Sequence, residues 1–118
     1  MNTIDAVQDK QVWNSAKVIQ VYATVDKQQK PEQTILNLLR DRLPNMRMLD
    51  LGIGGGRTTV HFAPLVKEYV GSDYAENMVD ACIQRFPDAG DHVRFQVIDA
   101  TAITGVPENY FDLVMFSF

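Results

Sequence analysis

The segment from Met48 to Thr59 constrains the fold of this chain most, because an apolar run leads directly into four glycines within five positions. The run before the glycines is typical of a buried strand, and the residues after them are typical of a helix. Glycine accepts positive φ and lets a ligand approach the backbone, so the chain can turn sharply here. The N–H groups of such a turn suit a carboxylate, a phosphate or a ribose, although a turn that binds no ligand is the alternative.

Short apolar runs alternate with helical patterns along the rest of the chain. Helices are predicted over residues 8–25, from Pro31 to just before Pro44, over 57–63 and over 75–86, and strands over 46–51, 68–72, 93–97 and 111–118. Strands that alternate with helices form parallel βαβ units, so the sequence predicts a doubly wound α/β sheet. Five aliphatic residues are predicted on the core side of the second helix: Ile35, Leu36, Leu38, Leu39 and Leu43.

The composition is that of one soluble globular domain, with 118 residues of which 46% are hydrophobic and 22% charged. The net charge of -4 and the absence of any Lys or Arg cluster argue against a nucleic-acid surface. The first 25 residues hold no apolar run long enough for a signal peptide or a membrane span, and we expect a cytoplasmic protein. Cys82 is the only cysteine, and no metal site is predicted.

Two aspartates follow predicted strands and mark the same edge of the sheet as the glycine turn. Asp73 comes directly after the strand 68–72, and Asp99 follows the strand 93–97. The carboxyl ends of parallel strands meet at one edge, where open α/β sheets bind their ligands. Asp73 is therefore placed to accept both hydroxyls of an adenosine ribose, and Asp99 to accept from an amino group. Taken separately, each aspartate is equally well explained as a solvated turn residue.

Two classes of cofactor compete for this arrangement. A dinucleotide-binding turn needs a small residue three positions after its second glycine, where this chain has Arg57. The pattern D-x-G-x-G-x-G that begins at Asp50, with the two aspartates after the strands, instead resembles the class I S-adenosylmethionine-dependent methyltransferases. The resemblance covers about residues 46–118 and implies a Rossmann-like three-layer α/β sandwich that binds S-adenosylmethionine. A NAD-dependent oxidoreductase and a non-catalytic S-adenosylmethionine-binding module are the alternatives.

The resemblance implies how the methionine and ribose portions of the cofactor are held. Asp50 and the backbone of Gly52 and Gly54 would face the methionine portion, with Asp50 complementing its ammonium group directly or through water. The carboxylate of Asp73 would hold the ribose hydroxyls. Replacing Asp73 by alanine should then lower the cofactor affinity at least about tenfold and change the stability little.

The resemblance also implies contacts to the adenine and to the reacting methyl group. Tyr74 and Met78 would pack against the adenine ring, although Met78 is as readily explained as helix core. Asp99 would accept from the exocyclic amine, and the N–H of Ala100 would reach a ring nitrogen. Ser117, at the end of the fourth strand, would lie at the methyl-transfer site.

The chain departs from the family at Ala75, where many members have a small hydroxyl residue that caps the following helix. The cap must therefore come from Asp73 or from solvent. Tyr22, in the first predicted helix, is a candidate to reach over the cofactor as part of a lid. We expect the two histidines, His61 and His92, to have surface roles.

The family resemblance also implies how the domain is organised. Residues 1–44 are expected to form N-terminal helices that act as a cap or lid, and residues 45–118 a partial cofactor-binding domain with strands in the order 3-2-1-4. Family members have seven strands, so the fourth strand would keep an unpaired apolar edge that recruits a second copy into a homodimer. The acceptor stays open, and the acidic balance favours a small molecule over a nucleic acid.

Overall fold

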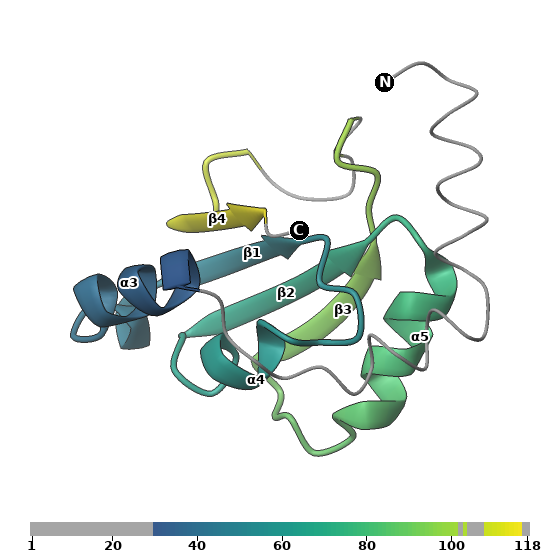
Figure 1. Ribbon diagram of the computed structural model, residues 1–118, viewed down its shortest axis with the longest axis horizontal. Helices are drawn as coiled ribbons and strands as arrows, with labels where there is room; N and C mark the ends of the chain where they lie inside the picture. Colours follow the sequence, from purple (N-terminus) through teal and green to yellow (C-terminus); the bar gives the residue numbers. More distant parts are fainter. Residues whose placement is uncertain (1–29, 102, 104–107, 117–118) are drawn as a thin grey trace.

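The computed structural model describes residues 30–101, 103 and 108–116. Four strands form one sheet in the order β3-β2-β1-β4 (Figure 1). They are β1 (Arg47–Leu51), β2 (Glu68–Asp73), β3 (Val93–Val97) and β4 (Leu113–Phe116). Every pairing is parallel, and the predicted order 3-2-1-4 is therefore confirmed.

The helices begin close to the predicted positions but end earlier. They are α3 (Lys30–Leu39), α4 (Thr59–Phe62) and α5 (Glu76–Arg85), with a 3-10 helix η1 (Leu43–Asn45) before β1. The prediction that Pro44 stops the second helix was wrong, because α3 ends at Leu39 and Pro44 lies within the first turn of η1. Proline is tolerated there because the first N–H groups of a helix have no intrahelical partner.

Helix α4 is much shorter than the predicted span 57–63. The backbone is still turning at Gly56, whose φ is 96°, and the first helical hydrogen bond is the one from the N–H of Val60 to the carbonyl oxygen of Gly56. Pro64 follows directly after the C-cap residue Ala63. The glycines therefore lengthen the turn at the expense of the helix.

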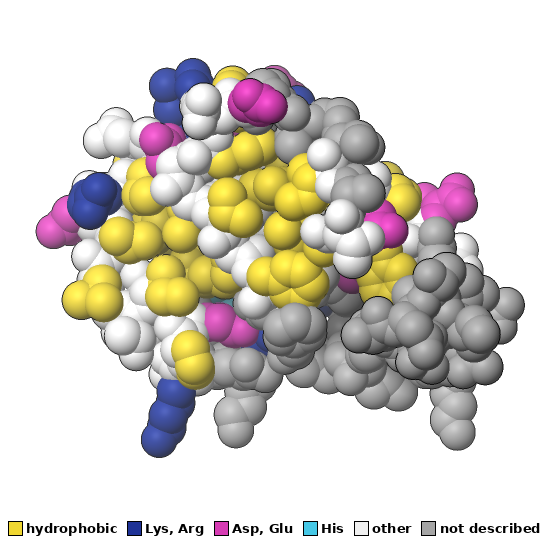
Figure 2. All heavy atoms as spheres, turned by 90° about the horizontal axis from the view of Figure 1, so that it is seen from above, with side chains coloured by type: hydrophobic (Ala, Val, Ile, Leu, Met, Phe, Trp, Pro, Cys, Tyr) yellow, Lys and Arg dark blue, Asp and Glu magenta, His cyan; other side chains and the backbone are white. Residues whose placement is uncertain are grey.

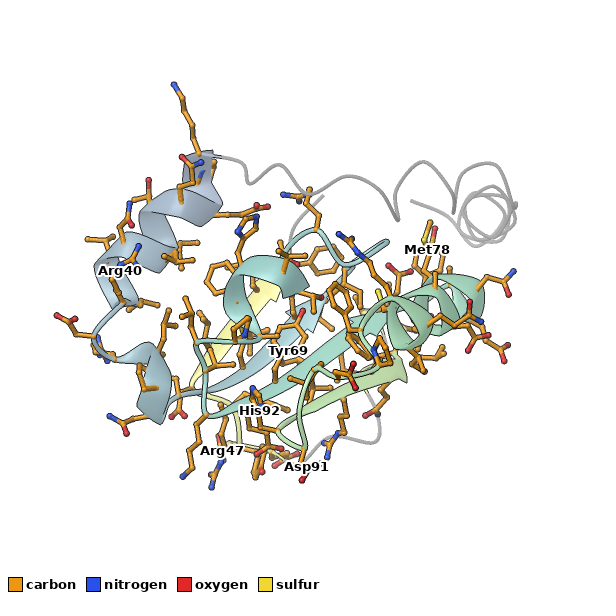
Figure 3. The ribbon with its side chains drawn as sticks, turned by 90° about the horizontal axis from the view of Figure 1, so that it is seen from below. Arg40, Arg47, Tyr69, Met78, Asp91 and His92 are labelled. Atoms are coloured by element: carbon orange, nitrogen blue, oxygen red, sulfur yellow. The ribbon has the colours of Figure 1, made fainter. Side chains whose placement is uncertain are left out.

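Helices α3, α4 and α5 pack on the same face of the sheet (Figures 1 and 3). Side chains of β1, β2 and β4 on this face join residues of α3 and α4 in one buried core, and Phe86 after α5 stacks on Phe95 of β3. The buried residues of this core are Leu36, Leu43, Met46, Met48, Phe62, Ala63, Val66, Tyr69 and Met115. Leu38 was wrongly predicted to belong to it and is 76% exposed, because it lies on the outer side of α3.

The opposite face of the sheet carries a second, smaller core. It is formed by Leu49, Leu51, Val70 and Ile98, with Phe111 packed against them. Next to this core, Val114 and Phe116 of β4 are 56% and 47% exposed. Figure 2 looks onto this side of the molecule and shows the hydrophobic side chains gathered there. None of the helices that the structure describes has the length and hydropathy needed to cross a membrane.

Candidate functional site

The glycine loop, residues 52–56, connects the end of β1 to the turn before α4 at the carboxyl edge of the sheet. Gly52, Gly54 and Gly56 have φ angles of 72°, 56° and 96°, which residues with a Cβ rarely adopt. The N–H groups of Gly52 and Ile53 donate to the carbonyl oxygen of Ser72 at 2.9 and 3.1 Å. These bonds tie the loop to the end of β2.

Two side chains of helix α5 form hydrogen bonds to the same loop. The thiol of Cys82 donates to the carbonyl oxygen of Gly54 at 3.3 Å, and Nη1 of Arg85 donates to that of Gly55 at 2.9 Å. Burial raises the pKa of Cys82 to about 12, so this side chain stays a thiol and keeps its proton for the bond. The loop is therefore fixed before any ligand binds.

Asp73 joins the ends of three elements. Its Oδ2 accepts from the N–H of Gly54 at 3.0 Å, and its Oδ1 accepts from the N–H of Ala75 at 2.9 Å. α5 has no side-chain hydrogen bond that caps its first turn, and its N-cap residue Ala75 is joined by its own N–H to Asp73. Its carbonyl oxygen also accepts from the N–H of Ile98 at 3.1 Å, which brings the end of β3 alongside. The carboxyl group is 6% exposed, and burial raises its pKa while the backbone N–H groups lower it.

Asp50 lies beneath the glycine loop, on the face of the sheet that α4 covers. Its Oδ2 accepts from Oγ1 of Thr58 at 2.5 Å and from the Tyr69 hydroxyl at 2.7 Å, while Oδ1 is buried without a hydrogen-bond partner. Tyr69 in turn shares a bond of 2.7 Å with Oγ1 of Thr59, and Figure 3 shows Tyr69 under α4. Asp50 is fully buried and contacts the base of the loop. The contact of its carboxyl group with the ammonium group of the cofactor stays a prediction.

Burial raises the pKa of Asp50 to about 6, against the lowering effect of the hydrogen bonds from Thr58 and Tyr69. A carboxyl group with a raised pKa in the folded state stabilises the fold while it is protonated and loses that contribution as the pH rises past about 6. The folded state therefore bears a cost for keeping Asp50 ionised at neutral pH.

We expect this cost to be measurable in the variant Asp50→Asn, which cannot ionise. The difference in the free energy of unfolding, Asp50→Asn minus wild type, should increase by roughly 2–3 kcal/mol as the pH rises from about 4 to about 7. Urea unfolding of both proteins across this range gives the difference at each pH. A difference that stays constant with pH would show that Asp50 titrates at its ordinary value.

Sequence reasoning missed several residues that build this site. Glu32 of α3 pairs with Arg57 at 2.5 Å, Tyr69 supports Asp50, and Arg85 holds the loop. Arg57 was noticed only as a departure from the dinucleotide pattern. The signal for Tyr69 was available, because it is a polar aromatic residue inside a buried strand and its hydroxyl needs a partner.

The residues expected around the adenine are placed as follows. Tyr74 is half-buried directly after β2, and Met78 of α5 is buried with 1% exposure. Asp99 is exposed after β3, where its Oδ1 accepts from the N–H and the hydroxyl of Thr101, and Ala100 is half-buried. Their contacts to adenine stay predictions.

Two of the residues named from the sequence, Tyr22 and Ser117, lie outside the described residues. Of the two histidines, His61 is half-exposed on α4, whereas the half-buried His92 bonds through Nε2 to the carbonyl oxygen of Ala63 at 2.8 Å. Within residues 30–101, 103 and 108–116, no group of three or more His, Cys, Asp or Glu side chains is arranged to hold a metal ion.

Comparison with known proteins identifies relatives by sequence. The uncharacterized methyltransferase YcgJ of Bacillus subtilis (strain 168) is 35% identical over 69 residues, which cover 58% of this chain and 27% of that protein. A probable non-canonical nonribosomal peptide synthetase, CymA of Salinispora arenicola (strain CNS-205), is 36% identical over 73 residues, which cover 60% of this chain and 1% of that protein. The chain thus spans about a quarter of the first relative and a very small part of the second.

Solved structures share the fold described above. The crystal structure of magnesium protoporphyrin IX methyltransferase from Synechocystis PCC 6803 with bound SAH has a TM-score of 0.73 at 20% identity, over 95% of this chain and 57% of that chain. The crystal structure of YcgJ has a TM-score of 0.62 at 27% identity, over 75% of this chain and 38% of that chain. The family described as "Methyltransferase domain" matches residues 48–118, the part that contains the glycine loop and all four strands except Arg47. This chain is a member of that methyltransferase domain family.

Proposed function

We propose that this chain is the cofactor-binding part of an S-adenosylmethionine-dependent methyltransferase with a small-molecule acceptor. The observation that carries the proposal is the bond of 3.0 Å between the carboxylate of Asp73 and the N–H of Gly54. This bond places a carboxylate suited to ribose hydroxyls directly beside a glycine loop, in a chain of the methyltransferase domain family.

The residues at the carboxyl edge fit such a cofactor chemically. S-adenosylmethionine offers two ribose hydroxyls, an adenine amine and an ammonium group, all of which are hydrogen-bond donors. Asp73 ends β2 and Asp99 follows the end of the neighbouring β3, and Asp50 brings a third carboxyl group whose Oδ1 is buried without a hydrogen-bond partner. The exposed Gly52 has no side chain to obstruct the approach of the methionine portion.

The chemistry that the cofactor supplies when bound is an activated methyl group on a sulfonium. The protein then needs to bind and orient rather than to activate. Asp73 would hold the ribose, Asp99 and Ala100 would fix the adenine, and the glycine loop would seat the methionine portion. Since Ser72, Cys82 and Arg85 hold the loop in place, little ordering is needed on binding, which favours affinity.

Calorimetry on the protein that contains this chain tests the proposed function. We expect S-adenosylhomocysteine to bind with one site per chain and NAD to give no heat, because Arg57 occupies the position that a dinucleotide turn needs small. Binding of NAD without S-adenosylhomocysteine would replace the proposal by a NAD-dependent oxidoreductase. Transfer of a labelled methyl group into a pool of cell metabolites then separates an enzyme from a non-catalytic binding module.

The outer edge of β4 supports a proposal about partners. β4 is an edge strand of the described sheet, and Val114 and Phe116 are exposed on its face. We expect the 118-residue chain by itself to self-associate through this strand, because an apolar edge offers unpaired N–H and C=O groups. Light scattering over a concentration series measures this, and Val114→Lys should reduce it. A stable monomer at all concentrations would exclude the homodimer.

The expected cytoplasmic location of the protein stays a prediction.

A further inference from the structure

A buried ion pair joins α3 to the residue that follows the glycine loop. Nη1 of Arg57 lies 2.5 Å from Oε2 of Glu32, and the two side chains are only 16% and 5% exposed. Glu32 stands in the first turn of α3, outside the part of the chain that the family comparison matches. Removing either partner of such a pair leaves a buried charge without compensation, so replacing either residue alone disturbs the contact between the two segments.

The charges of this pair act on Asp50. Thr58, the residue after Arg57, donates to Asp50 at 2.5 Å, so the ion pair and the carboxyl group are connected through the base of the loop. Apart from burial, which is the largest cause, Glu32 raises the pKa of Asp50 and Arg57 lowers it. The guanidinium of Arg57 pairs with Glu32, and its charge acts on Asp50 without a hydrogen bond between them.

The hydrogen-bond partners of Asp50, Thr58 and Tyr69, carry no charge at neutral pH. The hydroxyl of Tyr69 on β2 donates to Asp50, and burial raises the pKa of this tyrosine well above its ordinary value. The Cys82 thiol of α5 likewise has its pKa raised by burial, and β4 presents the apolar Met115 on this face. Glu32 and Arg57 are thus the charged residues that act on Asp50, after the larger effects of burial and of the hydrogen bonds from Thr58 and Tyr69.

We infer that Glu32 and Arg57 are positioning residues of the cofactor site, because their buried ion pair anchors the glycine loop to α3 and brings two opposite charges beside Thr58, which holds Asp50 beneath the loop. The inference rests on the proposed function. It makes the position of α3 part of the cofactor site, although no residue of α3 needs to touch the cofactor.

The two roles are separated by four variants. Glu32→Gln and Arg57→Gln both remove the anchor, but they shift the ionisation of Asp50 in opposite directions. The double variant removes the anchor and both charges, so the ionisation should return toward that of the wild type. Arg57→Lys keeps the charge and loses only the planar geometry of the guanidinium.

The experiment measures the dissociation constant of S-adenosylhomocysteine by calorimetry between about pH 5 and pH 8, a range that brackets the ionisation of Asp50. An ionised Asp50 favours the ammonium group of this ligand, so affinity should rise with pH. We expect the midpoint of this rise to move to lower pH in Glu32→Gln, to higher pH in Arg57→Gln, and to stay in place in Arg57→Lys. At the upper end of the range, both glutamine variants should bind at least about threefold more weakly, because the loop has lost its anchor.

A readout without ligand tests the anchor directly. Amide hydrogen exchange of residues 52–57 in the free protein should be faster in both glutamine variants and in the double variant. The matched control is Glu68→Gln, which removes the half-exposed ion pair between Glu68 and Arg47 at the other end of the strands. It should leave loop exchange and the pH midpoint unchanged.

The outcomes distinguish this inference from the proposed function. If the wild type binds no S-adenosylhomocysteine, the proposed function fails and the inference fails with it. If the wild type binds but the midpoints of Glu32→Gln and Arg57→Gln move together or not at all, only the charge role is overturned. Unchanged loop exchange in variants that remain folded overturns the anchor role.

Discussion

Replacement of Gly56 by alanine is expected to destabilise the protein by roughly 2–4 kcal/mol and to abolish cofactor binding. A Cβ at this position would lie 2.5 Å from Cε2 of Phe86, and the φ of 96° is one that alanine rarely adopts. Phe86 has little room to move because its ring stacks on Phe95 with a centroid distance of 6.1 Å. The strain therefore falls on the loop or on the end of α5, and chemical unfolding with calorimetry on the folded fraction measures both effects.

The matched control for this variant is Gly90→Ala, because Gly90 also has a positive φ, of 106°. A Cβ there would meet only the ring of His92, at 2.9 Å, and Gly90 lies in the segment before β3, away from the glycine loop. We expect Gly90→Ala to lower the stability through the same backbone strain and to leave cofactor affinity intact. Equal loss of binding in the two variants would show that the loop at Gly56 has no special role.

Replacement of Asp73 by alanine is expected to weaken cofactor binding at least about tenfold, because the bonds to the ribose hydroxyls are charge-assisted. The structure corrects the accompanying expectation that stability changes little. The carboxylate accepts from Gly54 and Ala75, so the substitution leaves two backbone N–H groups without their partner. We therefore also expect a loss of about 1–3 kcal/mol in the free energy of unfolding.

Asp99→Ala provides the comparison for Asp73→Ala, because Asp99 is exposed and its bonds are to the neighbouring Thr101. It should weaken cofactor binding with little effect on stability. Calorimetry with S-adenosylhomocysteine, at a temperature where each variant is folded, gives the two affinities. An unchanged dissociation constant in folded Asp73→Ala would show that the ligand lies elsewhere or lacks a ribose contact.

The order of the elements and the family could be predicted from the amino-acid sequence alone. Strands and helices alternate with periods that follow from local geometry, and the positions of the four strands were predicted to within a few residues. The glycine pattern and Asp73 predict that the site lies at the carboxyl edge, because the ends of parallel strands meet there. The lengths of α3 and α4 were predicted less well, because helix ends depend on turns that periodicity does not describe.

The contacts of the charged residues could not be predicted before the fold was known. The family resemblance implied a contact between Asp50 and the cofactor, which stays a prediction, and the structure adds that its side chain lies under α4 and bonds to Thr58 and Tyr69. The pairing of Glu32 with Arg57 joins residues 25 positions apart, and nothing in the local sequence links them. Such contacts are set by how the helices pack on the sheet, so they become visible only when the whole core is assembled.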